Sequence, residues 1–130
     1  MNGYIMRGCA HIGISTEDPD KCAAFYVENL GFHYYSEAEL SDGRKIVFVE
    51  NYGLVLEFVG GKEDNIGAGQ VDHICLEVQG IEALAEELKK KGFVPEDAKI
   101  GAMPDFFING AKNLFFTGPA GEKIELFDYT

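Results

Sequence analysis

The sequence has few basic side chains and no long apolar run. Only 11 Lys and Arg residues stand against 22 Asp and Glu residues, which leaves a net charge of −11. A chain this acidic repels phosphate backbones and anionic lipid headgroups, so we expect neither nucleic acid nor a membrane as a partner. No apolar stretch approaches the roughly 20 residues of a membrane span, and the start MNGYIMRGC lacks the apolar core of a signal peptide.

Cysteine is also scarce. Cys9, Cys22 and Cys75 form no CxxC motif and follow no regular spacing, so a disulfide framework is not expected. These features together predict a cytosolic (cytoplasmic) protein. Apolar residues make up 46% and charged residues 25% of the 130 residues, which is typical of one globular domain.

One pattern occurs twice along the chain. AHIGIST at 10–16 and DHICLEV at 72–78 each precede a predicted helix. Asp18 and Pro19 indicate the start of the first helix, and both helices end in Gly-Phe, at 31–32 and 92–93. Three strand-like runs follow each helix: HYYSEAEL, RKIVFVEN and GLVLEFV in the first half, FVPEDAKI, KNLFFTG and EKIELFDY in the second. This repeat predicts an α+β fold of two βαβββ modules, residues 8–60 and 70–129, joined by a linker at 61–69 within a single domain 1–130.

The repeat pairs four residues that can bind metal. His11 opens the first half and Glu57 lies in its last strand, while His73 and Glu125 hold the same places in the second half. Strand alternation places the apolar neighbours of all four on the opposite face. A lone strand histidine is usually a hydrogen-bonded structural residue, but two imidazoles and two carboxylates at repeated positions suit a divalent transition metal.

The whole chain from residue 8 to 129 resembles the vicinal oxygen chelate superfamily, which includes glyoxalases, bleomycin resistance proteins and extradiol dioxygenases. The stretches that carry the resemblance are AHIGIST, FYVENLGF, LVLEFV, VDHICLEV and GPAGEKIELFD. The resemblance implies that the modules form an open eight-stranded, U-shaped sheet around a metal cleft. It also implies that His11, Glu57, His73 and Glu125 are the metal ligands, with nickel, zinc, cobalt, manganese or iron(II) as the ion.

The resemblance implies a metal-dependent lyase or isomerase of the lactoylglutathione-lyase type, acting on a hemithioacetal or a similar small oxygen-chelating molecule. Glu125 would act as the base and Glu57 as its catalytic counterpart. Ser15 stands where glutathione-dependent glyoxalases tend to carry an arginine, which puts glutathione in question. A methylmalonyl-CoA epimerase and a bleomycin-resistance-type binding protein are the alternatives. A homodimer is the expected assembly, and module exchange within it stays open.

Other residues are secondary candidates. Cys75 shares the His73 face and is expected to be a small buried filler or to line the cleft. His33 has no counterpart in the second half, and Lys123 lies on the Glu125 face of its strand. The segment 100–110 carries large apolar side chains that include Met103, Phe106 and Phe107, so we expect it to close over the cleft or to pack on a partner subunit.

Overall fold

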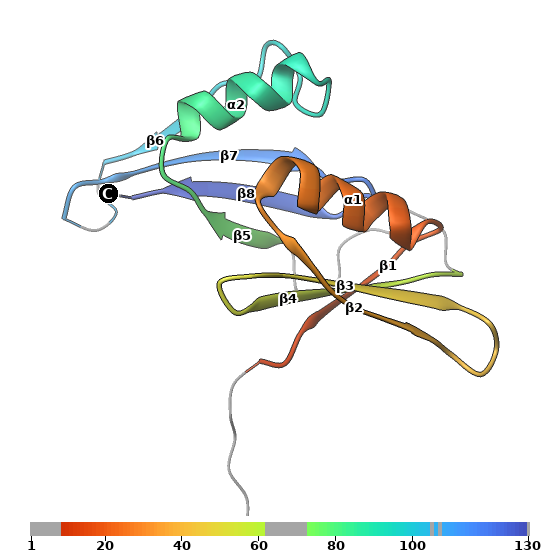
Figure 1. Cartoon of the computed structure of the whole chain (residues 1–130). Coiled ribbons are helices and arrows are strands. Elements are labelled where there is room, and N and C mark those ends of the chain that lie inside the picture. The colour runs from red at the N-terminus through yellow and green to blue at the C-terminus, as the bar shows by residue number, and fades with distance from the viewer. Residues whose placement is uncertain (1–8, 62–72, 105, 107, 130) are drawn as a thin grey trace, which may run out of the picture. The chain divides into compact units, whose positions relative to one another are not determined.

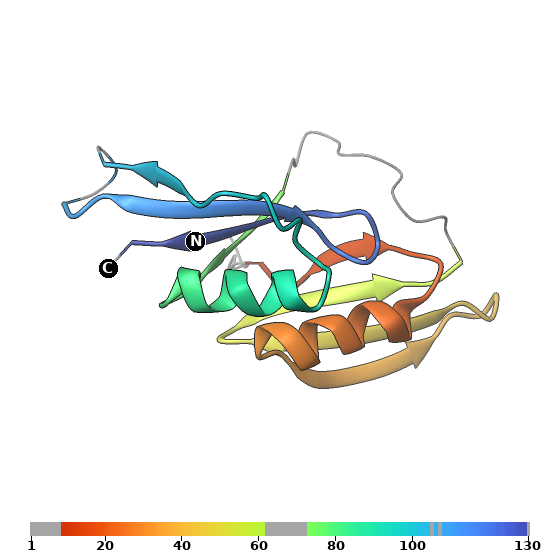
Figure 2. The same ribbon diagram turned by 90° about the horizontal axis from the view of Figure 1, so that it is seen from above.

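The computed structural model describes residues 9–61, 73–104, 106 and 108–129. The chain divides into two compact units, Met1–Asp64 and Asn65–Thr130. Each unit contains a four-stranded sheet and one helix along a face of that sheet, as Figures 1 and 2 show. The predicted α+β class is confirmed. Residues 62–69 of the predicted linker lie outside the described residues.

The first unit follows the predicted order of strand, helix and three strands. Its sheet has the order β1-β4-β3-β2, in which β1 runs parallel to β4 and the other pairs are antiparallel. The parallel pair needs a long crossover, and the helix and two strands between β1 and β4 supply it. The elements are β1 (Ile12–Ser15), α1 (Pro19–Leu30), β2 (His33–Glu39), β3 (Lys45–Asn51) and β4 (Leu54–Val59).

The second unit repeats this topology with the order β5-β8-β7-β6, and β5 is parallel to β8. The strand predicted at 93–100 is wrong, because the strand in this place is only three residues long and begins at Gly101. Pro95 lacks a backbone N–H for a sheet, and its carbonyl accepts a turn hydrogen bond from Ala98 N at 3.1 Å. The elements are β5 (Ile74–Glu77), α2 (Ile81–Lys90), β6 (Gly101–Met103), β7 (Ala111–Thr117) and β8 (Lys123–Asp128).

Helix α1 begins and ends at the residues that the sequence indicated. The carboxylate of Asp18 accepts a hydrogen bond from the backbone N of Lys21 at 3.0 Å, and Pro19 occupies the first turn, where its missing N–H costs nothing. Gly31 ends the helix in the left-handed conformation, with φ of 73°. Gly31 thereby makes the turn that leads the chain from α1 into β2.

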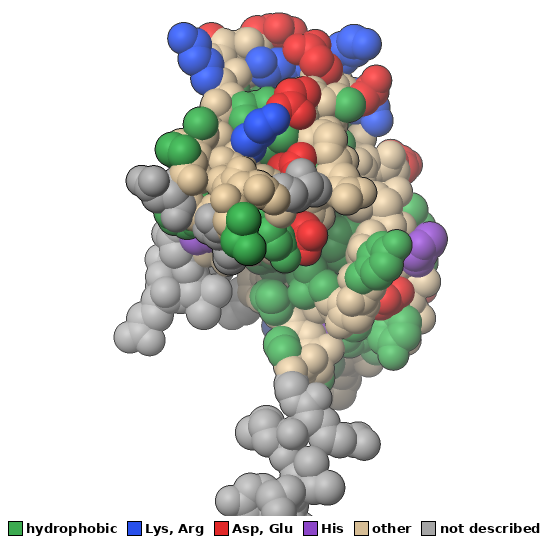
Figure 3. Space-filling view, turned by 90° about the vertical axis from the view of Figure 1, so that its left-hand side faces the viewer, with side chains coloured by type: hydrophobic (Ala, Val, Ile, Leu, Met, Phe, Trp, Pro, Cys, Tyr) green, Lys and Arg blue, Asp and Glu red, His purple; other side chains and the backbone are tan. Residues whose placement is uncertain are grey.

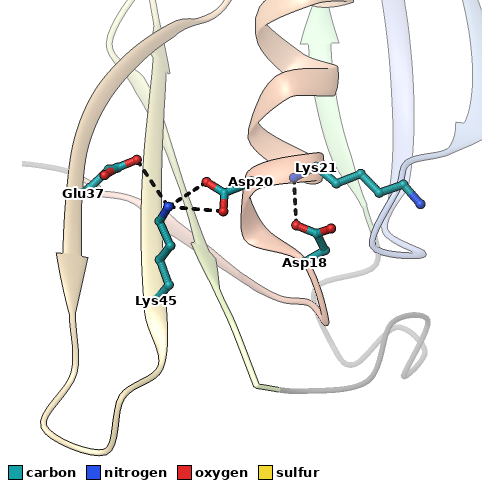
Figure 4. A network of polar contacts seen from close by, with 5 residues as sticks. All are labelled: Asp18, Asp20, Lys21, Glu37 and Lys45. Atoms are coloured by element: carbon teal, nitrogen blue, oxygen red, sulfur yellow. Dashed lines mark hydrogen bonds and ion pairs between the residues drawn. The ribbon is translucent and has the colours of Figure 1, made fainter.

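A surface ion network joins α1 to its sheet. The Nζ atom of Lys45 on β3 lies 2.9 Å from Oδ1 of Asp20 on α1 and 3.6 Å from Oε1 of Glu37 on β2 (Figure 4). All three side chains are largely solvent-exposed, so water and salt screen the network. The pKa of Lys45 is raised, chiefly by the hydrogen bond to Asp20.

Helix α2 is capped from the last strand of its unit. Oδ2 of Asp128 accepts hydrogen bonds from the backbone N atoms of Gly80 at 3.0 Å and Ile81 at 3.2 Å. The carboxylate thereby satisfies N–H groups at the positive end of the helix. Charged side chains of both signs gather at the top of Figure 3, on the side where Figure 1 places α2.

No helix among the described residues is long and apolar enough to cross a membrane.

The helix of each unit covers the apolar face of its sheet. In the first unit the buried side chains of α1 pack over β3 and β4, and in the second unit those of α2 pack over β7 and β8. On this face the buried residues of the sheets are Ile14, Val47, Val49, Leu56 and Phe58 in the first unit and Ile74, Leu114, Phe116, Ile124 and Leu126 in the second. The opposite face of each sheet is therefore the one that carries the histidine and glutamate.

Candidate metal centre

The first predicted pair comes together at the junction of β1 and β4. Gly13 is the cross-strand partner of Glu57, and His11 lies two residues before Gly13, so strand alternation brings it to the Glu57 face. Nε2 of His11 lies 3.4 Å from Oε1 of Glu57. The histidine itself stands one residue before the first residue of β1 rather than inside the strand.

The second predicted pair has the same construction. Cys75 is the cross-strand partner of Glu125 on β8, and His73 lies two residues before Cys75 and one residue before β5. Nε2 of His73 lies 3.1 Å from Oε1 of Glu125. Glu125 is buried, with 8% of its surface exposed, whereas Glu57 is only half-buried.

An aromatic ring backs each histidine. Phe48 on β3 is the register partner of Glu57, and Phe115 on β7 is the register partner of Glu125. Each ring meets the neighbouring imidazole edge-on, with centroids 5.7 Å apart for His11 and 5.3 Å apart for His73. These contacts limit how far the imidazoles can turn and hold them beside the carboxylates.

Within each pair, the distance between the histidine nitrogen and the glutamate oxygen fits two neighbouring ligands of an ion. Ligand atoms about 2.1 Å from a metal lie about 3.0 Å apart at a right angle and about 3.4 Å apart at the tetrahedral angle. The observed separations of 3.4 Å and 3.1 Å fall in this range. A neutral imidazole and a carboxylate are donors that Zn, Ni, Co, Mn and Fe(II) accept.

Each unit by itself offers an ion two protein ligands. The described residues contain no group of three or more His, Cys, Asp or Glu side chains that could hold a metal. The structure brings His11 to Glu57 and His73 to Glu125. That both pairs bind the same ion stays a prediction.

Asn113 is a site residue that the sequence reasoning missed. Its Nδ2 donates a hydrogen bond to Oε2 of Glu125 at 2.9 Å. Asn113 lies two residues before Phe115 on β7, so both share the Glu125 face. Only the register between β7 and β8 shows this, because the alternation of a single strand cannot say which side chains meet across a sheet.

The expectation that Cys75 is a small buried filler is wrong, because the residue is exposed. Partial burial of its thiol, followed by the charge of Glu125 and a hydrogen bond to that carboxylate, raises the pKa of Cys75 to about 11. In the first unit Gly13 occupies the equivalent place, and a Cβ atom there would lie 3.2 Å from Oε1 of Glu57.

The remaining candidates lie on the same faces. His33 is the cross-strand partner of Glu50, two residues from Phe48, so it shares the Glu57 face at the far strand of the sheet. Lys123 lies two residues before Glu125, with its Nζ 4.9 Å from the centroid of the Phe115 ring.

The segment 100–110 forms β6 at its start and then reaches the Glu125 face. The ring of Phe106 lies 6.5 Å from that of Phe127, two residues beyond Glu125 on β8. That the segment closes over the cleft or packs on a partner subunit stays a prediction. Phe107, another of its aromatic residues, lies outside the described residues.

Comparison with known proteins identifies curated relatives of similar sequence and solved structures of similar fold. Human mitochondrial methylmalonyl-CoA epimerase is 35% identical over 104 residues, which cover 71% of this chain and 59% of the epimerase. The mouse enzyme is 31% identical over the same length, with 58% of its own chain covered. The aligned part thus spans about three fifths of the length of these curated relatives.

Solved structures show the same fold. A glyoxalase family protein from Enterococcus faecalis superimposes with a TM-score of 0.72 at 24% identity, over 93% of this chain and 97% of its own. The fosfomycin resistance protein FosX from Listeria monocytogenes, solved with Mn(II) and sulfate, gives a TM-score of 0.71 at 18% identity, over 97% and 95%.

A family model matches residues 8–126, nearly the whole chain and both His–Glu pairs. The predicted resemblance is therefore confirmed, and the chain belongs to the Glyoxalase/Bleomycin resistance protein/Dioxygenase superfamily.

Proposed function

We propose that the protein is a divalent-metal-dependent enzyme that moves a proton at a carbon next to a carbonyl group of a small substrate. The ligands of the ion are His11, Glu57, His73 and Glu125. The observation that carries the proposal is the duplication of one His–Glu pair with the same register and nearly the same separation in both units. A structural ion pair at one place would give no reason for its repetition.

The chemistry follows from the residue types. The ion supplies Lewis-acid stabilisation of the negative charge that develops on a substrate oxygen when a neighbouring carbon loses its proton. Glu125 is the base, because its carboxylate is buried and held in place and can take that proton. Glu57 stands at the repeated position and exchanges a proton on the opposite face of the same carbon.

The relatives favour an acyl-CoA epimerase, which the sequence left as an alternative. Epimerisation removes a proton from one face of a carbon and returns one to the other face, so two carboxylates at repeated positions suit it. The methylmalonyl-CoA epimerases at 31% to 35% identity support this substrate class. The predicted lactoylglutathione-lyase type remains the second candidate, because the ending GPAGEKIEL resembles that of glyoxalases.

Proton exchange in deuterium oxide tests the proposal. The purified protein, loaded in turn with Mn²⁺, Co²⁺, Ni²⁺ or Zn²⁺, is incubated with methylmalonyl-CoA, and mass spectrometry and chiral analysis follow the substrate. An epimerase incorporates deuterium at the acidic carbon and interconverts the two epimers. Protein stripped with EDTA serves as the control and should incorporate deuterium only at the uncatalysed rate.

A parallel assay uses hemithioacetals of methylglyoxal with glutathione and with a smaller thiol. Turnover of these adducts alone would favour the lyase type, and a strong preference for glutathione would show that Ser15 does not exclude it. Tight binding of either substrate without turnover by any metal form would contradict the enzyme and favour a binding protein.

A further inference from the structure

The two His–Glu pairs differ in what holds the second oxygen of the carboxylate. Oε1 of Glu125 lies 3.1 Å from Nε2 of His73, and Oε2 accepts the hydrogen bond from Nδ2 of Asn113 at 2.9 Å. In the first unit the position equivalent to Asn113 is Ile46, which pairs with the residue two places after Glu57. Its aliphatic side chain has no N–H to donate.

The backbone opposite Asn113 is shaped for this contact. Gly101 on β6 is the cross-strand partner of Asn113, and a Cβ atom at Gly101 would lie 2.5 Å from Oδ1 of Asn113. Real side chains do not approach so closely, so any residue with a Cβ would push the amide away from its present rotamer. Glycine therefore leaves the space in which Asn113 can face Glu125.

We propose that Asn113 is a positioning residue that fixes the carboxylate of Glu125 for metal binding and proton transfer. The inference rests on the proposed function, in which Glu125 is both ligand and base. By occupying Oε2, the amide leaves Oε1 turned toward His73, so one oxygen is set where a metal ligand is needed. A carboxylate that is already oriented loses less conformational freedom when the ion binds.

A purely structural role is the competing explanation, because a buried carboxylate needs a partner wherever it lies. The two explanations differ in metal affinity. If Asn113 positions Glu125, Asn113→Leu weakens the binding of Mn²⁺ or Zn²⁺ by about 10- to 100-fold, as loss of a residue that orients a ligand usually does. Gly101→Ala displaces Asn113 without removing it and is expected to weaken binding by a smaller factor.

The matched control is Asn29→Leu. Nδ2 of Asn29 donates to the backbone oxygen of Phe25 at 2.9 Å within α1, so the same kind of side chain loses a hydrogen bond of the same length on an element that carries neither pair. The control is expected to lower thermal stability and to leave metal affinity unchanged. Calorimetric titration of the metal-free proteins with Mn²⁺ alone measures the affinities, and thermal scans in EDTA measure the stabilities.

A polarity exchange provides the rescue. In Glu125→Gln the new amide nitrogen and Nδ2 of Asn113 are both donors. Asn113 therefore binds the Gln oxygen, which turns away from the ion. In the double variant Glu125→Gln with Asn113→Asp, the aspartate accepts a hydrogen bond from the Gln nitrogen. The Gln oxygen therefore turns back toward His73. Metal affinity of the double variant should exceed that of Glu125→Gln alone by about tenfold or more, because the Gln oxygen is again oriented toward the ion.

Two results would overturn the inference in distinguishable ways. Wild-type affinity in Asn113→Leu, or an equal loss in Asn29→Leu, would show that Asn113 serves the fold and would leave the metal centre intact. Failure of the wild-type protein to bind any divalent ion would instead remove the proposed metal centre and the positioning role together.

Discussion

Replacing Glu125 by Gln separates the two roles that this residue is proposed to have. The amide has the same shape as the carboxylate but cannot take a proton from carbon. Loss of a general base costs about 10²- to 10⁴-fold in turnover, which corresponds to about 3 to 5 kcal/mol of transition-state stabilisation. We expect this loss in the deuterium-exchange assay with whichever substrate the wild-type protein turns over.

The surroundings of Glu125 predict an accompanying loss of metal affinity. Its two oxygens lie 3.1 Å from His73 Nε2 and 2.9 Å from Asn113 Nδ2, and a Gln side chain can present an oxygen to only one of them. Turnover must therefore be measured at saturating metal, where the remaining defect reports basicity alone. Glu82→Gln on α2, whose carboxylate pairs with Lys112 on the surface, is the control and should keep full turnover. Full turnover of Glu125→Gln at saturating metal would remove this residue from the mechanism.

Three further predictions concern metal, a helix cap and a thiol. A divalent ion at a hundredfold excess over its dissociation constant should stabilise the protein by about 2.7 kcal/mol, about 10 °C in melting temperature for 130 residues, and EDTA should reverse the shift. Asp128→Ala removes the acceptor for the backbone N atoms of Gly80 and Ile81, so it should cost about 0.5 to 2 kcal/mol in thermal unfolding, whereas Asp128→Asn should cost less. The raised pKa of Cys75, about 11, keeps its thiol protonated at pH 8. In metal-free protein, iodoacetamide should therefore alkylate the exposed Cys9 faster than Cys75. The alkylation rate at Cys75 should keep rising above pH 9. No shift with any ion, an unchanged melting temperature in Asp128→Ala, or a rate at Cys75 that levels off below pH 9 would contradict these three expectations in turn.

The features that the sequence predicted correctly are local or repeated. Asp18, Pro19 and Gly31 mark the ends of α1, because capping and left-handed turns depend on residues within a few positions of one another. The shared face of His11 and Glu57, and likewise of His73 and Glu125, follows from strand alternation within each repeated module.

The site residue that the sequence did not reveal depends on pairing between strands. Asn113 meets Glu125 only because β7 and β8 pair in one particular register, and a shift by one residue would turn it to the other face. The displacement of β6, the second strand of the second unit, has a different and local cause. The run from 93 to 100 contains apolar residues, but Pro95 interrupts it, and β6 is too short to show periodicity of its own.

Titration of the metal-free protein with Mn²⁺ tests the central claim, that both His–Glu pairs serve a single ion. The measurement compares wild-type protein with His11→Ala and His73→Ala in a calorimeter. We predict one ion for each chain in the wild-type protein, and a severe loss of affinity in both variants, because each removes one ligand of the same centre. Wild-type affinity in either variant, or two independent sites for each chain, would contradict the account.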